Sequence, residues 1–493
     1  MADKTFGITV KKDENFSEWF TQVVSEQGAN LADIRYGVQG HVVHMPWTMR
    51  IANKLYSIIE DEVENDDHEP ILFPTVIPKA NLMKEKEHAG FTPEVFWVTK
   101  AGDRKLEEPE ALRPTGETAF YPMYSLWIRS HNDLPFKRYQ SRITVFRNEM
   151  TTRPFLRGRE FMFFETHDVF ATHDEAMEQI AKDKAIMDRV ITEKLKIPFV
   201  FFKRPKWDAF KGAEDSYCAD SLLPNGRRNQ ISSTHDLGQR FAKAYGIKFK
   251  DKDMKEKFAH QTCFGPGIWR IIASIISLHG DDNGLVLPMK IAPVQVIIIP
   301  ITFSKKKELS EKVMRKADEL AKKLSKKYSV KVDKSNNTPG YKFNQAELMG
   351  IPIRLELGPK DLEKEQAVVV RRTSKDKVAS SIKDIEKIIS EQVELFEKDL
   401  LERTKKNYET NTRSAESLDD IKKIMDKHKG FVISPFCSIG KDGEHCADVL
   451  KAETKGANVC GVPFGSEEKP KSGMKCPVCG KEAKHMVWLA KSI

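Results

Sequence analysis

The alternation of apolar and polar residues is clearest over residues 135–170, where it predicts two β-strands joined by a loop. Side chains alternate between the two faces of a strand, so the odd positions of the first strand share one face: Tyr139, Ser141, Ile143, Val145, Arg147 and Glu149. The second strand places five side chains on one face in the same way: Phe161, Phe163, Glu165, His167 and Val169. Charged groups on an otherwise apolar face are costly to bury unless they meet partners or a ligand. The pattern therefore predicts either a sheet with internal ion pairs or a binding site.

The loop between these two strands carries Arg153, Arg157 and Arg159. Guanidinium groups so close together on a hairpin suit the oxygens of a polyphosphate. The alternative that this pattern leaves open is a basic loop that faces solvent.

The N-terminal part of the chain shows mainly helical periodicity. Apolar residues recur at helical spacing in three segments: 14–27, 47–66 and 173–192. Residues 68–82 instead read as a strand interrupted by Pro74 and Pro78. Prolines confine such a strand to a sheet edge or to a boundary between subunits.

Polar residues beside turns form three further groups. Thr115 and Glu117 lie two residues apart, in an extended segment before a helix that we expect to begin near Tyr121. A second group precedes a helix expected near Leu237: Gln230, Ser233 and His235. The third is a glycine turn at 265–267, after which a helix begins around Ile268 with Arg270 in its first turn. Each group alone is equally compatible with an ordinary turn or cap.

Residues 292–372 alternate between strand and helix patterns. The continuous apolar run at 292–303 is typical of a buried parallel strand, and charged helical segments follow it. This order predicts an α/β domain. A helix expected over about 379–408 has a single apolar face.

Length and charge fit a protein of several domains. The chain has 493 residues, a net charge of +9 and a pI of about 8.9, which is compatible with RNA binding. Its longest apolar runs are far too short to span a bilayer, and residues 1–16 contain no apolar signal region. We therefore expect a cytoplasmic protein that does not bind membranes.

The C-terminal region contains two pairs of cysteines that suggest a metal site. Cys437 and Cys446 are loosely spaced, whereas Cys476 and Cys479 form a Cys-Pro-Val-Cys-Gly turn. Such a turn presents two thiolates to one tetrahedral ion, so we expect structural zinc. The loose first pair leaves other ligands open, namely Cys460 and His485, and the alternative is two pairs of reduced, buried thiols.

Six segments in order carry a resemblance to a known family: FPTVIP, RPTGETAFYPM, FRNE with REFMFFETH, SSTHDLGQ, GPGIWR with HGDDNGLVLP, and GYKFNQAELMGIPIRLELGPKDLE. Together they resemble prolyl-tRNA synthetases of the archaeal/eukaryotic type, which are class II aminoacyl-tRNA synthetases. The resemblance implies an α+β class II catalytic core with an antiparallel sheet of six strands and flanking helices. An α/β anticodon-binding domain and a small α+β zinc-binding C-terminal domain would follow. The corresponding boundaries are 1–288, 289–400 and 401–493.

The resemblance also implies a reaction and partners. Proline and ATP would form prolyl-adenylate, and the prolyl group would pass to proline tRNA, which is bound by its acceptor end and anticodon. The enzyme would be a homodimer, with FPTVIP (class II motif 1) at the subunit boundary, and no DNA would be bound. Because only about a hundred residues separate His167 from Gly265, we expect no inserted editing domain.

The same resemblance assigns roles to the polar and aromatic residues. Arg147 (motif 2) would bridge the proline carboxylate and the α-phosphate, and Arg270 (motif 3) would stack on adenine or meet the γ-phosphate. The other ATP-binding residues would be Glu149, with Mg²⁺, and Arg157, Phe161 and Gln230. Proline would lie among Thr115, Glu117, Phe163, Glu165, His167, Phe210, Ser233 and His235. In the anticodon domain the candidates are Lys342, Arg354, Glu356 and Lys360.

Three departures from the family's usual sequence stand out. Phe163 and Phe164 replace Trp and Gln. Motif 3 reads GPGIWR, one residue longer than the usual G-L-S/T-T-R, and this puts the backbone path by Gly265 in question. The chain ends in Ile493, where members usually end in a Tyr whose carboxylate reaches toward the active site.

Two other functions remain open at this point. One is a catalytically silent synthetase-like paralogue that binds tRNA, although the chain keeps Arg147, Arg270, Thr115 and Glu117. The other is a class II synthetase for another small amino acid, which the apolar Phe163 and Phe210 disfavour.

Overall fold

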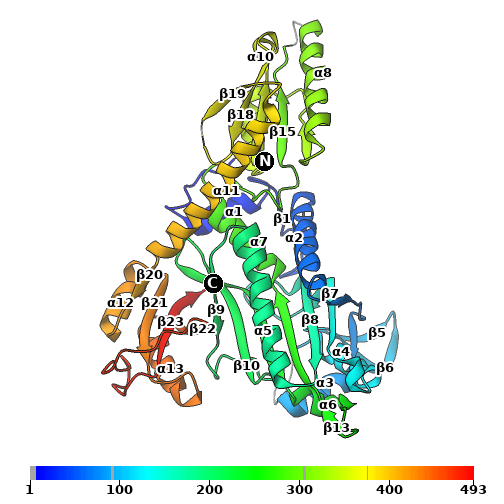
Figure 1. The fold of residues 1–493 in the computed structure, drawn as a ribbon, viewed down its shortest axis with the longest axis vertical. Coiled ribbons are helices and arrows are strands. Elements are labelled where there is room, and N and C mark those ends of the chain that lie inside the picture. Colours follow the sequence, from blue (N-terminus) through cyan, green and yellow to red (C-terminus); the bar gives the residue numbers. More distant parts are fainter. Residues whose placement is uncertain (1–6, 90–93, 304–306, 375) are drawn as a thin grey trace.

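The structure is a computed structural model that describes residues 7–89, 94–303, 307–374 and 376–493. One large sheet forms its centre, and a smaller α/β domain lies at one end of the long axis (Figure 1). In the described part of the chain no helix is long and apolar enough to cross a membrane.

The large sheet has eleven strands in the order β20-β21-β23-β22-β9-β10-β11-β14-β8-β7-β3. Its central part is antiparallel throughout and consists of β9 (Phe199–Lys203), β10 (Asp215–Leu222), β11 (Arg227–Gly238), β14 (His260–Pro266), β8 (Glu160–Phe170) and β7 (Phe136–Phe146). The short β3 (Glu69–Pro70) joins β7 in parallel at the edge. The expected six-stranded antiparallel core is confirmed.

Helices pack on this sheet and build its core. The main ones are α1 (Phe16–Val24), α2 (Pro46–Glu64), α5 (His173–Met187) and α7 (Ile268–His279). A capping box of Thr172 and Glu175 starts α5, and a π-helical turn, Asp188–Lys194, continues it. Almost every residue of α7 is buried, which fits its nearly continuous apolar sequence. This burial fixes the N-terminal end of α7, where Arg270 lies.

Smaller elements surround the core. Two of them are short antiparallel pairs: β1 (Ala32–Asp33) with β2 (Val43–His44), and β12 (Lys248–Lys250) with β13 (Glu256–Phe258). A three-stranded sheet contains β4 (Val76–Pro78), β6 (Arg104–Leu112) and β5 (Trp97–Ala101). Helices α3 (Lys79–Ala89), α4 (Glu117–Trp127) and α6 (Arg240–Tyr245) lie close to one another beside it.

The α/β domain has a five-stranded sheet in the order β16-β15-β17-β18-β19. The strands are β15 (Val296–Pro300), β16 (Val330–Val332), β17 (Ile353–Leu357), β18 (Gln366–Arg371) and β19 (Lys377–Ser381). Its helices are α8 (Lys307–Leu324), α9 (Pro339–Leu348) and α10 (Pro359–Glu363). The long helix α11 (Ile385–Thr410) then runs from this domain toward the C-terminal elements (Figure 1).

The C-terminal elements extend the catalytic sheet. They are β20 (Thr412–Ser414), α12 (Leu418–Lys427), β21 (Phe431–Phe436), α13 (Glu444–Glu453), β22 (Ala457–Pro463) and β23 (His485–Ser492). Strand β22 pairs with β9, and β23 also pairs in parallel with β11. The third expected region therefore shares hydrogen bonds with the catalytic core.

The structure corrects five local expectations. Arg142 has φ +55° and the pairing register shifts between Gln140 and Ile143, so a bulge interrupts the predicted alternation of the first strand. That strand also ends at Phe146, before Arg147 and Glu149. The remaining three concern helix starts: α4 begins at Glu117, β11 continues to Gly238 before α6, and residues 377–381 form β19 rather than helix.

A buried ion triplet joins the C-terminal elements to the core. Asp220 accepts hydrogen bonds from Arg204 at 2.7 Å and from Arg228 at 2.9 Å. Arg204 also donates to the backbone oxygen of Cys460 on β22 at 2.8 Å. Two guanidinium groups thus share one carboxylate in the interior.

We expect Asp220→Asn to lower the free energy of unfolding by about 3–5 kcal/mol, because it leaves two buried cations without a counter-charge. Denaturant unfolding of the variant and the wild type measures the difference. Asp253→Asn is the matched control, since its carboxylate pairs with Lys255 near the surface, and it should change stability by less than about 1 kcal/mol. Equal effects of the two substitutions would contradict this account of the triplet.

Candidate active site

Two adjoining cavities open on one face of the antiparallel sheet. The first has a volume of about 170 Å³ and the second about 560 Å³. They share five lining residues: Arg147, Glu149, Phe163, Ser233 and Gly265. The site is therefore one cleft with two compartments, and Arg147 lies where they meet.

Four arginines line the first compartment: Arg147, Arg153, Arg157 and Arg270. The Arg153 guanidinium bonds to the backbone oxygen of Ser17 and lies over the Phe20 ring, which leaves three guanidinium groups for a ligand. Burial, and then repulsion by Arg147 and Arg157, lowers the pKa of Arg270 to about 10. Two acids line the same compartment, Glu149 and Glu160, and the Glu149 carboxylate lies 3.6 Å from Arg157. This excess of positive charge favours an anionic ligand with several oxygens.

The other predicted residues of this compartment lie around the three arginines. Phe161 and Gln230 both line it, and the Arg147 guanidinium lies 5.9 Å from the centre of the Phe161 ring. Arg270 donates to the backbone oxygen of Gln230 at 3.4 Å. A flat ring, a groove and three cations together match the shape and charge of a nucleoside triphosphate.

The glycine turn of motif 3 has a defined path despite its extra residue. A Cβ atom at Gly265 would lie 2.9 Å from the Phe163 ring, so only glycine allows β14 to approach this side chain. The Gly267 amide donates to the backbone oxygen of Ile231 at 2.8 Å, and α7 begins at the next residue. The turn thereby delivers Arg270 to the cavity.

Seven of the eight residues predicted to hold the amino acid line the second compartment: Thr115, Glu117, Phe163, Glu165, Phe210, Ser233 and His235. His167 does not line it, because its ring is fully buried behind Glu165. Phe163 and Phe210 supply the apolar surface. The compartment is thus acidic at one wall and aromatic at another.

Glu117 is the best acceptor for a cation in this compartment. It is nearly buried, and its carboxylate accepts a short hydrogen bond from the Thr115 hydroxyl. The Cys263 thiol lies 3.9 Å from its other oxygen. Within the described residues no basic side chain forms an ion pair with Glu117. The two donors to Glu117, Thr115 and Cys263, are neutral, whereas Glu165 and His167 have atoms within 4.8 Å of it. A buried carboxylate whose hydrogen bonds come from neutral groups favours a cationic ligand.

Glu165, by contrast, is already occupied by its own neighbours. Its two oxygens accept hydrogen bonds from the Gln140 side chain at 2.7 Å and from the Gly116 amide at 3.1 Å. His167 bonds to Glu165 at 3.0 Å, and the Tyr121 hydroxyl lies 2.9 Å from the other nitrogen of that ring. Glu165 therefore fixes the backbone between Thr115 and Glu117.

Three of these supporting residues were not predicted from the sequence: Gln140, Gly116 and Tyr121. Gln140 lies beside Glu165 only because the bulge at Arg142 changes the register of β7. A Cβ atom at Gly116 would lie 2.5 Å from the Glu165 carboxylate, so glycine is required there. The Gly in RPTGETA was the one signal that pointed to this contact.

His235 closes the second compartment as a neutral ring. Its Nδ1 lies 2.7 Å from the Ser216 hydroxyl, and its ring packs against Phe210 at 5.1 Å. Burial, helped by repulsion from His167 and Arg147, lowers the pKa of His235 to about 4. At neutral pH this wall of the compartment carries no added positive charge.

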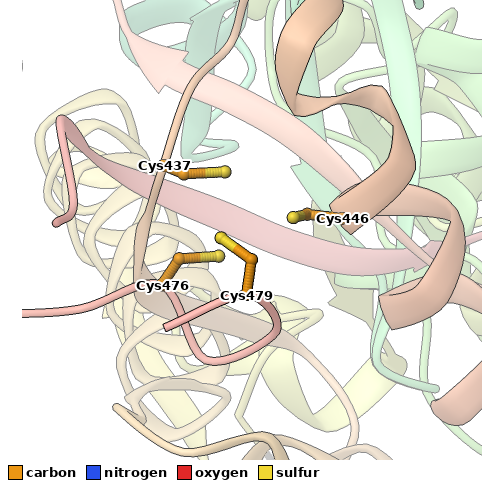
Figure 2. Close-up of side chains that lie close together, drawn as sticks. All are labelled: Cys437, Cys446, Cys476 and Cys479. Atoms are coloured by element: carbon orange, nitrogen blue, oxygen red, sulfur yellow. The ribbon is translucent and has the colours of Figure 1, made fainter. Parts of the chain in front are cut away.

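Four cysteine thiols converge in the C-terminal elements (Figure 2). Cys437 follows β21, Cys446 lies in α13, and Cys476 and Cys479 flank a turn before β23. Their sulfur atoms all lie within 4.8 Å of one another. The two substitutes considered from the sequence lie outside this group, since the Cys460 thiol bonds to Asn458 and His485 pairs with Glu467.

The depressed pKa of His235 predicts a loss of stability in acid. The unfolded chain binds a proton at this residue below about pH 6.5, but the folded chain does so only below about 4, so stability falls as the pH decreases between these values. By this linkage the wild type should lose about 2 kcal/mol more than His235→Gln between pH 7 and pH 5. Denaturant unfolding at both pH values tests this, with exposed His428→Gln as the control. An identical pH dependence in wild type and His235→Gln would be the contrary result.

Comparison with known proteins places this architecture in a family. Three family models match: "tRNA synthetase class II core domain (G, H, P, S and T)" over residues 96–279, "Anticodon binding domain" over 295–392, and "Prolyl-tRNA synthetase, C-terminal" over 418–493. The proline–tRNA ligase of Thermofilum pendens is 50% identical over 99% of both chains, and that of Pyrococcus abyssi is 39% identical over 97% of this chain and 98% of the other.

A solved structure agrees with these matches. The Giardia lamblia prolyl-tRNA synthetase in complex with prolyl-adenylate superposes with a TM-score of 0.94 at 33% identity, covering 99% of this chain and 100% of that one. Fold, cleft and sequence similarity along the full length lead to the same conclusion: the chain belongs to the prolyl-tRNA synthetase family of class II aminoacyl-tRNA synthetases.

Proposed function

We propose that this protein attaches proline to proline tRNA in two steps, through a prolyl-adenylate intermediate made from proline and ATP. The observation that carries the proposal is the position of Arg147 between a cationic compartment and a compartment that offers Glu117 to a cation. Proline has both a carboxylate and a secondary ammonium group, and ATP is a polyanion. The cationic compartment matches ATP in charge, and the compartment with Glu117 matches the ammonium group of proline.

In the first step a carboxylate oxygen of proline attacks the α-phosphorus of ATP, and the bond from that phosphorus to pyrophosphate breaks. Both reactants are anions, so the site must hold them together against their repulsion. Arg147 would bridge the carboxylate and the α-phosphate. Arg270 and Arg157 would hold the adenine and the phosphate tail, with Phe161 on the other face of the base.

The proline side of the cleft relies on fit and on a fixed acceptor. Thr115 and Glu117 would accept the two N–H groups of the ammonium, while Phe163, Phe210, Ser233 and His235 enclose the ring. Glu165 and His167 act behind them by holding the backbone of Gly116 in place. Phe163 occupies the position where the family usually has Trp, and its ring still lines the compartment.

Glu149 is suited to hold Mg²⁺. Its carboxylate lines both compartments and remains partly exposed, and Mg²⁺ prefers such oxygen ligands together with substrate phosphates. Bound there, the ion would neutralise part of the charge on the phosphates and on the departing pyrophosphate. Arg157, close to Glu149, supplies charge to the same oxygens from the protein itself.

In the second step a ribose hydroxyl of the 3′-terminal adenosine of proline tRNA attacks the carbonyl carbon of prolyl-adenylate. An ester bond forms, the bond from that carbon to the phosphate breaks, and AMP leaves with the proton taken up by its phosphate or by solvent, while the α/β domain holds the anticodon. Of the candidates there, Lys360 is exposed, whereas Lys342 donates to the backbone oxygen of Asp333 and is buried. Arg354 bonds to Glu356 at 3.0 Å and covers the Phe343 ring at 4.6 Å. Arg354 and Glu356 are themselves buried, so Lys360 is the candidate whose exposure suits contact with splayed bases. The protein would act in the cytoplasm, where thiols stay reduced and tRNA is charged, because all seven of its cysteines are free thiols.

The motif 1 segment supports a homodimer. Leu72 is 76% exposed and Leu126, near the end of α4, is 54% exposed. Between them the Phe73 and Trp127 rings lie 6.1 Å apart, which joins the two segments into one apolar patch. We expect a dimer in sedimentation experiments and a shift toward monomer in Leu72→Arg/Leu126→Arg. Met254→Arg, at another exposed apolar residue, should leave the wild-type association unchanged.

The four converging thiols suit a structural zinc ion. Four sulfur donors from two separate segments form the ligand set of closed tetrahedral sites. Zinc there would tie α13 and β21 to the turn before β23. The ion would contribute folding free energy and no chemistry to the reaction.

We therefore expect one zinc ion per chain in metal analysis. Cys476→Ser should lose the ion and lower the unfolding midpoint, because the ion stabilises only the folded state. Cys460→Ser is the control and should keep the zinc, since this thiol lies outside the cluster. Zinc loss from the Cys460 variant alone would show that the ligand set is different.

The proposed reaction is tested by ATP–pyrophosphate exchange with each of the twenty amino acids. We expect exchange with proline, and a loss of about 10²–10³-fold in Arg147→Ala, because the bridge between the two anions is removed. Arg138→Ala is the matched control, since this arginine is on the same hairpin but pairs with Glu69 and lines neither compartment. Exchange with another amino acid would overturn the pocket assignment. No exchange with intact tRNA binding would favour the catalytically silent paralogue.

A further inference from the structure

The tip of the arginine loop has an unusual backbone. Arg153 and Arg157 bond to each other through their backbones at 2.8 and 2.9 Å, which closes a tight turn. Inside this turn Phe155 has φ +65°, the left-handed region that L residues other than glycine, asparagine and aspartate rarely adopt. A bulky residue stays in that conformation only where its surroundings hold it there.

Phe155 is held by two other rings, those of His44 and Trp269, and the three rings come from three separate segments. Trp269, in the first turn of α7, stacks on His44 of β2 with ring centres 4.0 Å apart and planes at 23°. The Phe155 ring meets Trp269 edge-on at 5.7 Å and lies 5.5 Å from His44. Phe155 and Trp269 are only 4% and 6% exposed. These three rings, hereafter the aromatic cluster, connect motif 2, motif 3 and the N-terminal hairpin.

The cluster is held by ring packing. The Nδ1 atom of His44 and the Nε1 atom of Trp269 are both buried, and neither has a hydrogen-bond partner in the described structure. Burial lowers the pKa of His44 to about 4, so its ring is neutral at physiological pH. Offset stacking of neutral rings stabilises a contact without adding charge.

The contact between the arginine loop and α7 must not add further positive charge, because both segments carry arginines. Arg157 extends from the loop toward the compartment that Arg270 also lines, and the two guanidinium groups repel each other. This repulsion disfavours a loop that lies against α7, although Glu149 at 3.6 Å and the backbone oxygen of Ile493 at 3.1 Å from Arg157 offset part of it. The aromatic cluster opposes it, because Trp269 immediately precedes Arg270 and Phe155 lies two residues before Arg157.

We propose that Trp269 is a positioning residue for ATP: by packing on His44 and Phe155 it holds the arginine loop against α7, so that Arg157 and Arg270 face the phosphates together. The unusual motif 3 sequence of this chain, GPGIWR, is explained by this packing. GPGIWR carries a large ring just before its arginine, where the family's usual G-L-S/T-T-R carries a threonine. The proposal rests on the proposed function, because it assigns this compartment to ATP.

Proline-dependent exchange at varied ATP and proline, together with calorimetric ATP binding, tests the proposal. In Trp269→Ser we expect the KM and Kd for ATP to rise about tenfold or more. A shift of the Arg157 guanidinium by about 1 Å is enough for an effect of this size. The KM for proline should change less than about twofold. Trp269→Phe, which keeps a ring, should restore most of the ATP affinity.

A second comparison separates positioning from general damage. If Trp269 acts through Arg157, then Trp269→Ser added to Arg157→Ala should weaken ATP binding little beyond Arg157→Ala alone, because coupled residues are not additive. Trp97→Ser is the matched control, since this half-exposed tryptophan of β5 lines neither compartment. Its KM for ATP should equal that of the wild type.

Three results would overturn the proposal: unchanged ATP affinity in folded Trp269→Ser, equal rises in both KM values, or effects of Trp269→Ser and Arg157→Ala that multiply. If Trp269→Ser does not fold, Phe155→Gly replaces it, because glycine tolerates φ +65° and only the ring contact is lost. Unchanged ATP affinity in that variant would also overturn the proposal. Proline-dependent exchange by the wild type is measured in the same experiment. Its absence would contradict the proposed reaction, whereas normal exchange by the wild type with unchanged ATP affinity in the variants would contradict only the role of Trp269.

Discussion

Repulsion among arginines that line one small cavity is the constraint on which the rest of this structure depends. Arg147, Arg157 and Arg270 come from a strand end, a loop and a helix start, and each lines the same small cavity. Like charges at such distances separate unless the backbone beneath them is rigid. The long antiparallel sheet, the almost entirely buried α7 and the aromatic cluster each hold one of these positions. The folded enzyme therefore maintains an arrangement that becomes favourable only when a polyanion is present.

The amino-acid side of the cleft follows a different principle. There the hydrogen bonds that the structure describes for Glu117 come from the neutral Thr115 and Cys263, whereas Glu165 accepts hydrogen bonds from Gln140 and Gly116 and pairs with His167. Glu117 is therefore left to bind the ligand and Glu165 to hold the backbone, and the different hydrogen-bond partners of the two carboxylates account for this difference. The division also explains why Gly116 must lack a side chain, since the saturated carboxylate occupies that space.

The sequence was informative where the structure is regular. The shared face of Phe161, Phe163 and Glu165 was predicted correctly because β8 has no bulge. The face of the preceding strand was wrong because one residue, Arg142, adopts a left-handed conformation that a period of two does not reveal. Contacts between distant segments were also missed. No local pattern indicates that Phe155, Trp269 and His44 meet, since each ring alone reads as ordinary core.

The pairing of β22 with β9 has a consequence for the order in which this protein is made. About 250 residues separate the two strands, and a ribosome needs on the order of ten to fifty seconds to synthesise that length. During this interval the outer edge of β9 is unpaired, and Phe202 lacks the Phe431 and Trp488 rings that later cover it. The nascent catalytic sheet must therefore be shielded from other chains until its last strands emerge, which makes translation itself the vulnerable period for this enzyme.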